Sequence, residues 1–91
     1  MYSISFTNRF KKDLKLCQKR GLDLSHIQEA ISILAETGSL PSQYRPHKLN
    51  GKFNGQWECH IEPDWLMVWE QNDKEFNLLF LYTGTHSDLF K

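Results

Sequence analysis

The chain has 91 residues and a mass of 10.8 kDa, and its 11 Lys and Arg residues balance 11 Asp and Glu residues. This length supports one domain, residues 1–91, and the 40% apolar and 13% aromatic content excludes a disordered chain. No apolar run approaches the roughly 18 residues that span a bilayer. No signal peptide is visible, and the two cysteines form no disulfide framework, so a small soluble cytoplasmic domain without a membrane partner is expected.

The neutral total hides an uneven distribution of charge. Residues 1–20 carry six basic residues against Asp13 alone, and residues 45–57 add three basic residues and no acid. The segment from Glu58 onward is acidic. The asymmetry indicates one basic face suited to a polyanion, although an ordinary solvated helix surface explains the same pattern, so charge alone does not decide.

The first half of the chain predicts a strand followed by two helices. Residues 2–6 alternate apolar and polar, and Thr7 is an N-cap for a helix that ends at Gly21. A second helix begins after Asp23 and runs to about Thr37, before Gly38. Each helix has one apolar side, which favours an antiparallel hairpin, and residues 39–46 form a loop.

The second half predicts β-structure. Two Asn-Gly turn signals lie close together, and strands follow over residues 56–61, 66–71 and 76–83. The fold class is therefore α+β, with an N-terminal strand, a two-helix hairpin and a three- to four-stranded antiparallel sheet. We expect the helices to cover one side of the sheet and the functional residues to lie on its open side.

Three of the four histidines are candidates for chemistry. His47, His60 and His86 lie at or near strand ends, and Asp64 follows His60 closely, whereas His26 is expected to face solvent from the second helix. Such a set could bind zinc or transfer protons near neutral pH. No His-x-His spacing favours the metal, and a purely structural role for the three histidines is the remaining alternative.

Three segments match one known family in order and spacing. They are His47-Lys48-Leu49-Asn50-Gly51, His60-Ile61-Glu62-Pro63-Asp64-Trp65 and the C-terminal run from Thr83 to Phe90. Together they resemble YafQ-type toxins, a His-rich branch of the RelE superfamily of bacterial toxin–antitoxin modules. The motifs cover about half of the chain, and the strand–helix–helix start suits a RelE-like fold.

The resemblance implies a ribosome-dependent mRNA endonuclease that cuts the codon held in the A site and so inhibits translation. The implied catalytic set is His47, His60, Asp64 and His86, with Trp65 and Phe90 shaping the substrate site. Arg45, Lys48 and Lys52 lie near His47 in the sequence and could contact phosphates. Attack by the ribose 2′-hydroxyl needs a base and an acid, which imidazoles supply, so no metal or cofactor is expected. His47 or His60, helped by Asp64, is favoured as the base and His86 as the acid.

The resemblance also implies partners. A cognate antitoxin silences such a toxin, the ribosome and mRNA are its targets, and operator DNA is bound only through the antitoxin complex. Two alternatives stay open: a ParE-like protein that poisons DNA gyrase, and an RNA- or ribosome-binding module without catalysis. The His and Asp set argues against the first, because gyrase poisoning requires no proton transfer. Cys17 and Cys59 are expected to be core residues.

Overall fold

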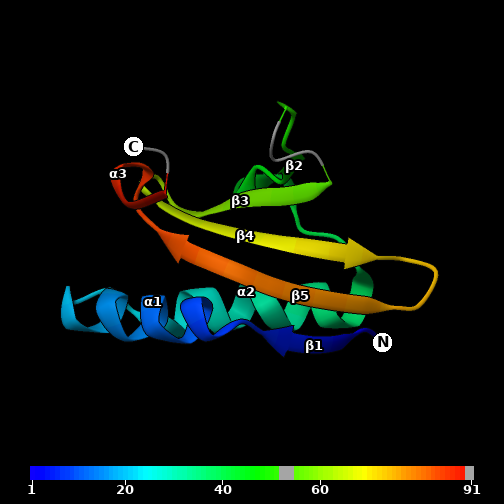
Figure 1. The fold of residues 1–91 in the computed structure, drawn as a ribbon, viewed down its shortest axis with the longest axis horizontal. Helices are drawn as coiled ribbons and strands as arrows, with labels where there is room; N and C mark the ends of the chain where they lie inside the picture. The colour runs from blue at the N-terminus through cyan, green and yellow to red at the C-terminus, as the bar shows by residue number, and fades with distance from the viewer. Residues whose placement is uncertain (52–54, 90–91) are drawn as a thin grey trace.

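The computed structural model describes residues 1–51 and 55–89. The chain folds into one mixed sheet with helices on one side. The sheet order is β1-β5-β4-β3-β2, and Figure 1 shows α1 and α2 beside the half of the sheet that contains β5 and β1. The antiparallel part, β2 to β5, is the sheet that the sequence predicts. The N-terminal strand, β1, was predicted, but its place in the sheet was not. It pairs in parallel with the last strand, β5, and so becomes the fifth strand of the sheet.

The N-terminal half follows the predicted order. Strand β1 covers Ser3–Phe6, α1 covers Asn8–Lys19 and α2 covers Leu24–Thr37. The Thr7 hydroxyl accepts the backbone N–H of Phe10 and caps α1, and the Asp23 side chain caps α2. Gly38 ends α2 with a φ of 77°, a left-handed conformation that glycine adopts without strain. These caps confirm the predicted helix boundaries.

The C-terminal half supplies the remaining strands and a terminal helical turn. Strands β2, β3, β4 and β5 cover His47–Lys48, Gln56–Glu62, Trp65–Asn72 and Asn77–Gly84. The loop before β2 contains a short 3₁₀-helix, η1, at Ser42–Tyr44, and the helical turn α3 covers His86–Leu89. No helix within the described residues is long and apolar enough to cross a membrane.

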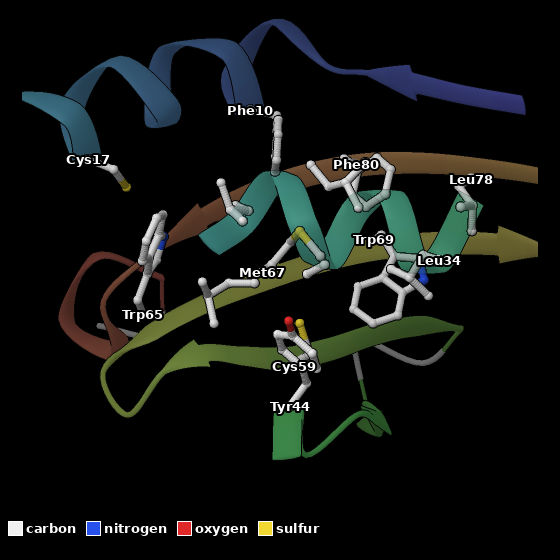
Figure 2. Close-up of a cluster of buried hydrophobic side chains, with 14 residues drawn as sticks. Phe10, Cys17, Leu34, Tyr44, Cys59, Trp65, Met67, Trp69, Leu78 and Phe80 are labelled. Carbon is white, nitrogen blue, oxygen red and sulfur yellow. The ribbon is translucent and has the colours of Figure 1, made fainter. Parts of the chain in front are cut away.

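The core lies between the helices and one face of the sheet. Figure 2 shows α1, α2, the η1 segment and the central strands all contributing side chains to it. Cys17 and Cys59 are buried there as free thiols, as predicted, and burial raises the pKa of both. This close packing makes the sheet a rigid support for the side chains on its other face.

The other face, which we call the open face, has a fixed arrangement of rows across β3, β4 and β5. One row is Glu58, Val68 and Tyr82, and the next is His60, Leu66 and Gly84. Val68 and Leu66 have no exposed surface, although they point away from the helices. One residue that contributes cover is Tyr82, whose hydroxyl reaches across β4 to the side chain of Gln56, 3.2 Å away. The open face therefore has an apolar floor with polar groups around it.

Candidate active site

Asp64 and His86 form a hydrogen-bonded pair at one end of the sheet. Asp64 occupies the tight turn between β3 and β4, and His86 begins α3 directly after β5. One carboxylate oxygen, Oδ1, accepts the backbone N–H of His86 at 3.1 Å and lies 2.9 Å from ring atom Nδ1. These hydrogen bonds hold the pKa of Asp64 below its ordinary value. The pair fixes Nδ1 as the protonated nitrogen and leaves Nε2 to exchange a proton.

His60 completes this group. Its ring centroid lies 5.9 Å from that of His86, and its Nδ1 lies 3.4 Å from the carbonyl oxygen of Pro63. A carbonyl only accepts hydrogen bonds, so this contact also favours the Nδ1–H form. Among the described residues, neither His60 nor His86 has a hydrogen-bond partner at Nε2. Two neighbouring imidazoles thus have one nitrogen each for proton transfer.

His47 lies on β2, opposite Glu58 of β3, and has a different environment. Its Nε2 is 3.1 Å from a carboxylate oxygen of Glu58, its partner across the strand pair, and its Nδ1 is 3.0 Å from the carbonyl oxygen of Arg45. Both ring nitrogens therefore face acceptors, an arrangement that suits the doubly protonated imidazolium. The sequence predicted His47 as a candidate catalytic residue, and the structure pairs it with Glu58.

Glu58 is a residue of this site that sequence reasoning missed. Its side chain is only 8% exposed, yet it carries a carboxylate that pairs with His47. The signal was present, because residues 56, 58 and 60 share the polar face of β3. Glu58 and His60 are two residues apart on that face, so the His47–Glu58 pair and the His60–Asp64–His86 group are neighbours.

A second missed feature is a stacked cation. The guanidinium carbon of Arg9 lies 4.4 Å from the centre of the Tyr82 ring, and Arg9 also approaches Asp13 at 3.6 Å. The carboxylate of Asp13 accepts the backbone N–H of Thr83 at 3.1 Å, which ties α1 to the end of β5. Burial raises the pKa of Tyr82. Arg9 therefore places a positive charge over the open face.

The prediction that Trp65 shapes the substrate site is wrong. Trp65 is 1% exposed, and its indole N–H donates to the hydroxyl of Thr83 at 2.9 Å within the core. As the first residue of β4 it points toward the helices, as Figure 2 shows, while Asp64 beside it stays in the turn. Trp65 thus supports the strand ends that carry Asp64 and His86, and has no face to offer a base.

The predicted phosphate-contacting residues separate in space. Arg45 borders a pocket of about 140 Å³ that His60 and Glu62 also line. Lys48 lies on the opposite side of β2 from His47, because successive strand residues alternate, and its ammonium is 5.6 Å from the Trp57 ring centre. The structure therefore does not bring Lys48 to the histidines. Lys52 and Phe90 lie outside the described residues.

The metal alternative depends on how the His, Cys, Asp and Glu side chains are grouped. The described part of the chain contains no group of three or more His, Cys, Asp or Glu side chains placed to hold a metal ion. His26, as expected, is exposed, and its Nδ1 lies 3.1 Å from a carboxylate oxygen of Glu62. Of the four residues predicted as catalytic, His60, Asp64 and His86 lie together, and the fourth, His47, pairs with Glu58.

Comparison with known proteins identifies the family. The family model described as the bacterial toxin YafQ of type II toxin–antitoxin systems matches residues 2–91. The mRNA interferase toxin YafQ of Escherichia coli K12 is 38% identical over 88 residues, which cover 96% of this chain and 94% of the relative. The chain belongs to the YafQ family. The resemblance seen in the three sequence motifs is confirmed.

Solved YafQ-family structures share the whole fold. The toxin in a crystal structure of the DinJ–YafQ complex of E. coli superposes with a TM-score of 0.90 at 34% identity, covering 100% of both chains. A metal-bound toxin from Helicobacter pylori superposes with a TM-score of 0.89 at 36% identity, covering 99% of this chain and 100% of the other. The chain therefore shares its whole fold with both toxins.

Proposed function

We propose that this chain is the toxin of a type II toxin–antitoxin module and acts as a ribosome-dependent mRNA endonuclease. The observation that carries the proposal is the group formed by His60, Asp64 and His86 on the open face of a YafQ fold. Such a group supplies what RNA cleavage requires without a cofactor, namely two imidazoles that each keep one nitrogen for a proton. Curated YafQ relatives are named mRNA interferases, which supports the same activity.

In the proposed mechanism His60 acts as the base and His86 as the acid. His60 Nε2 takes the proton of the ribose 2′-hydroxyl, and the resulting oxygen attacks the adjacent phosphorus. The bond from phosphorus to the 5′-oxygen breaks, and His86 Nε2 gives its proton to that leaving oxygen. The products are a 2′,3′-cyclic phosphate and a 5′-hydroxyl. Asp64 supports the imidazolium form of His86 because its negative charge lies 2.9 Å away.

Negative charge that develops on the phosphate requires nearby cations. The His47 imidazolium paired with Glu58 and the stacked guanidinium of Arg9 are the candidates that the described residues offer. His47 would act through its charge, because both of its N–H groups already have acceptors. Arg9 is 55% exposed at its side chain and keeps N–H donors for a phosphate oxygen.

The basic face of α1 is proposed as the contact with ribosomal RNA. Lys11, Lys12 and Lys15 are exposed on this helix, whereas Arg9 and Arg20 point into contacts with other parts of the chain. Cations without fixed partners are suited to phosphates of a large RNA, and such binding weakens as salt rises. The chain would act in the cytoplasm, where translating ribosomes are.

A cognate antitoxin is proposed as the protein partner. A relative has been crystallised as the DinJ–YafQ toxin–antitoxin complex. The open face of this chain carries the proposed catalytic histidines and a cationic side chain, so a partner that covers this face would silence the toxin. An acidic or apolar segment that folds on binding would suit this face. Operator DNA would be bound only through that complex.

The proposal is tested by induced expression followed by primer extension on a cellular transcript. Wild type is expected to produce discrete in-frame cuts, and His86→Gln none. Intact mRNA with DNA damage would instead support a gyrase poison. Intact mRNA with stalled translation would support a binding module. Either of the last two results overturns the proposed activity.

A further inference from the structure

The helical turn that carries His86 has little packing of its own. It covers only His86–Leu89, and none of its described residues is buried. A single turn of helix is not stable by itself, because nucleation costs more than its few hydrogen bonds return. Polar contacts must therefore determine where His86 lies relative to His60.

Asp88 supplies those contacts from within the turn. Its Oδ2 accepts the backbone N–H of Thr85 at 2.9 Å, while its own backbone N–H donates to the Thr85 hydroxyl at 3.2 Å. This reciprocal pair is a capping box around His86. Gly84 makes room for it, since a Cβ there would lie 2.9 Å from the same Asp88 oxygen.

Arg20 connects this box to the rigid part of the fold. Its guanidinium donates to Asp88 through Nη1 at 2.6 Å and Nη2 at 3.2 Å, a two-pronged contact between residues 68 positions apart. Arg20 is the C-cap of α1, a helix anchored in the core by Phe10 and Cys17. Together with the Thr85 contacts, Arg20 holds the pKa of Asp88 well below its usual range.

We propose that the Arg20–Asp88 pair positions His86 for proton donation. Asp64 holds the imidazole of His86 from one side, and the clamp formed by Arg20, Asp88 and Thr85 holds its backbone from the other. The proposal rests on the proposed function in that it assigns His86 the role of acid. Arg20 and Asp88 are positioning residues, since both act through α3.

A positioning role for Arg20 and a direct RNA contact by Arg20 predict different effects of substitution. If Arg20 served only to attract phosphate, removal of Asp88 would free the guanidinium and improve binding. If Arg20 acts by holding α3, removal of either partner misplaces His86 in the same way. The two substitutions then share one effect, and the double variant is no worse than either single one.

The experiment is a double-mutant cycle with purified ribosomes and a defined mRNA. Arg20→Ala, Asp88→Asn and the double variant are each expected to lower kcat about 10- to 100-fold, the effect of misplacing a catalytic group by roughly 1 Å, with KM little changed. Lys15→Ala, which removes an equal charge from the same helix, is expected to raise KM instead. The clamp is overturned if Asp88→Asn cleaves as fast as wild type, if Arg20→Ala behaves like Lys15→Ala, or if the two effects add.

A second measurement does not depend on cleavage. Imidazole ¹⁵N signals of the free protein report the tautomer of each histidine, and His86 is expected to be protonated at Nδ1 in wild type. Arg20→Lys, which keeps the charge but loses the two-pronged contact, should mix the tautomers of His86 and leave His26 unchanged. An unaltered His86 signal would overturn the clamp. If wild type fails to cleave mRNA but Arg20→Lys changes the His86 signal, the proposed function fails while the positioning role stands.

Discussion

Two imidazole–carboxylate pairs lie on the same sheet, and they differ in what they can do. In the His86–Asp64 pair both side chains are more than half exposed, and His86 keeps one ring nitrogen for exchange. In the His47–Glu58 pair the carboxylate is almost buried, and both ring nitrogens have acceptors. We therefore propose that the first pair carries protons and that the second contributes charge. The number of acceptors around each imidazole makes the difference.

The largest predicted effect comes from the proton carrier. His86→Gln should lower cleavage at least about 100-fold, because glutamine cannot donate a proton to the leaving oxygen. The melting temperature should stay close to that of wild type, since the side chain is 57% exposed. A reconstituted translation assay with thermal melting measures both. His26→Gln is the matched control and should cleave normally; a His86→Gln protein that still cleaves contradicts the assignment.

Replacement of the carboxylate in the same pair should have a smaller effect. Asp64→Asn keeps an oxygen that can accept from His86 but removes the charge that favours the imidazolium. Cleavage should fall about 10- to 100-fold, the range for a charge-assisted hydrogen bond lost from a transition state. Single-turnover kinetics on ribosome-bound mRNA measures the change. A loss as large as that of His86→Gln would mean that Asp64 itself transfers the proton.

The His47–Glu58 pair should respond mainly in stability. Glu58→Gln leaves His47 without its charged partner, at an expected cost of about 1–3 kcal/mol in the free energy of unfolding. The cleavage rate, measured well below the melting temperature, should fall less than in Asp64→Asn. Urea unfolding provides the first value. Glu70→Gln, on the exposed part of the neighbouring strand, is the control and should unfold like wild type. A Glu58→Gln protein with wild-type stability but no activity would make Glu58 a catalytic group.

The smallest effect concerns acid stability. The pKa of Asp88 is lower in the folded chain than the roughly 3.9 of an unfolded Asp, so its ionised form stabilises the fold above that value. The contribution is lost as pH falls through the folded pKa. The difference in melting temperature between wild type and Asp88→Asn should therefore be constant from about pH 5 to 8 and shrink below about pH 4. In an Arg20→Ala background most of this pH dependence should disappear.

Local signals predicted the elements well, because each boundary has a local cause. Thr7 and Asp23 cap the helices, Gly38 ends one of them, and alternation in residues 56–61 placed His60 and Cys59 on opposite faces. The parallel pairing of β1 with β5 could not be read locally, since it joins residues more than 70 positions apart.

The motifs predicted candidate residues but not the contacts between them. They named His60, Asp64 and His86 and grouped Asp64 with the base, whereas the structure pairs it with His86. Trp65 was misread because its motif position says nothing of which face of β4 it occupies. Glu58, Arg9 and the Arg20–Asp88 clamp escaped because each depends on a contact between distant segments.

The central claim is that the 2′-hydroxyl is the nucleophile and that imidazoles move the protons. Mass spectrometry of the upstream RNA fragment, cut by the wild-type chain on the ribosome, tests this most directly. We expect a 2′,3′-cyclic phosphate or its 3′-phosphate hydrolysis product, and no cut when the nucleotide before the scissile bond has a 2′-deoxyribose. A 3′-hydroxyl end, or normal cutting of the 2′-deoxy message, would contradict the roles given to His60 and His86.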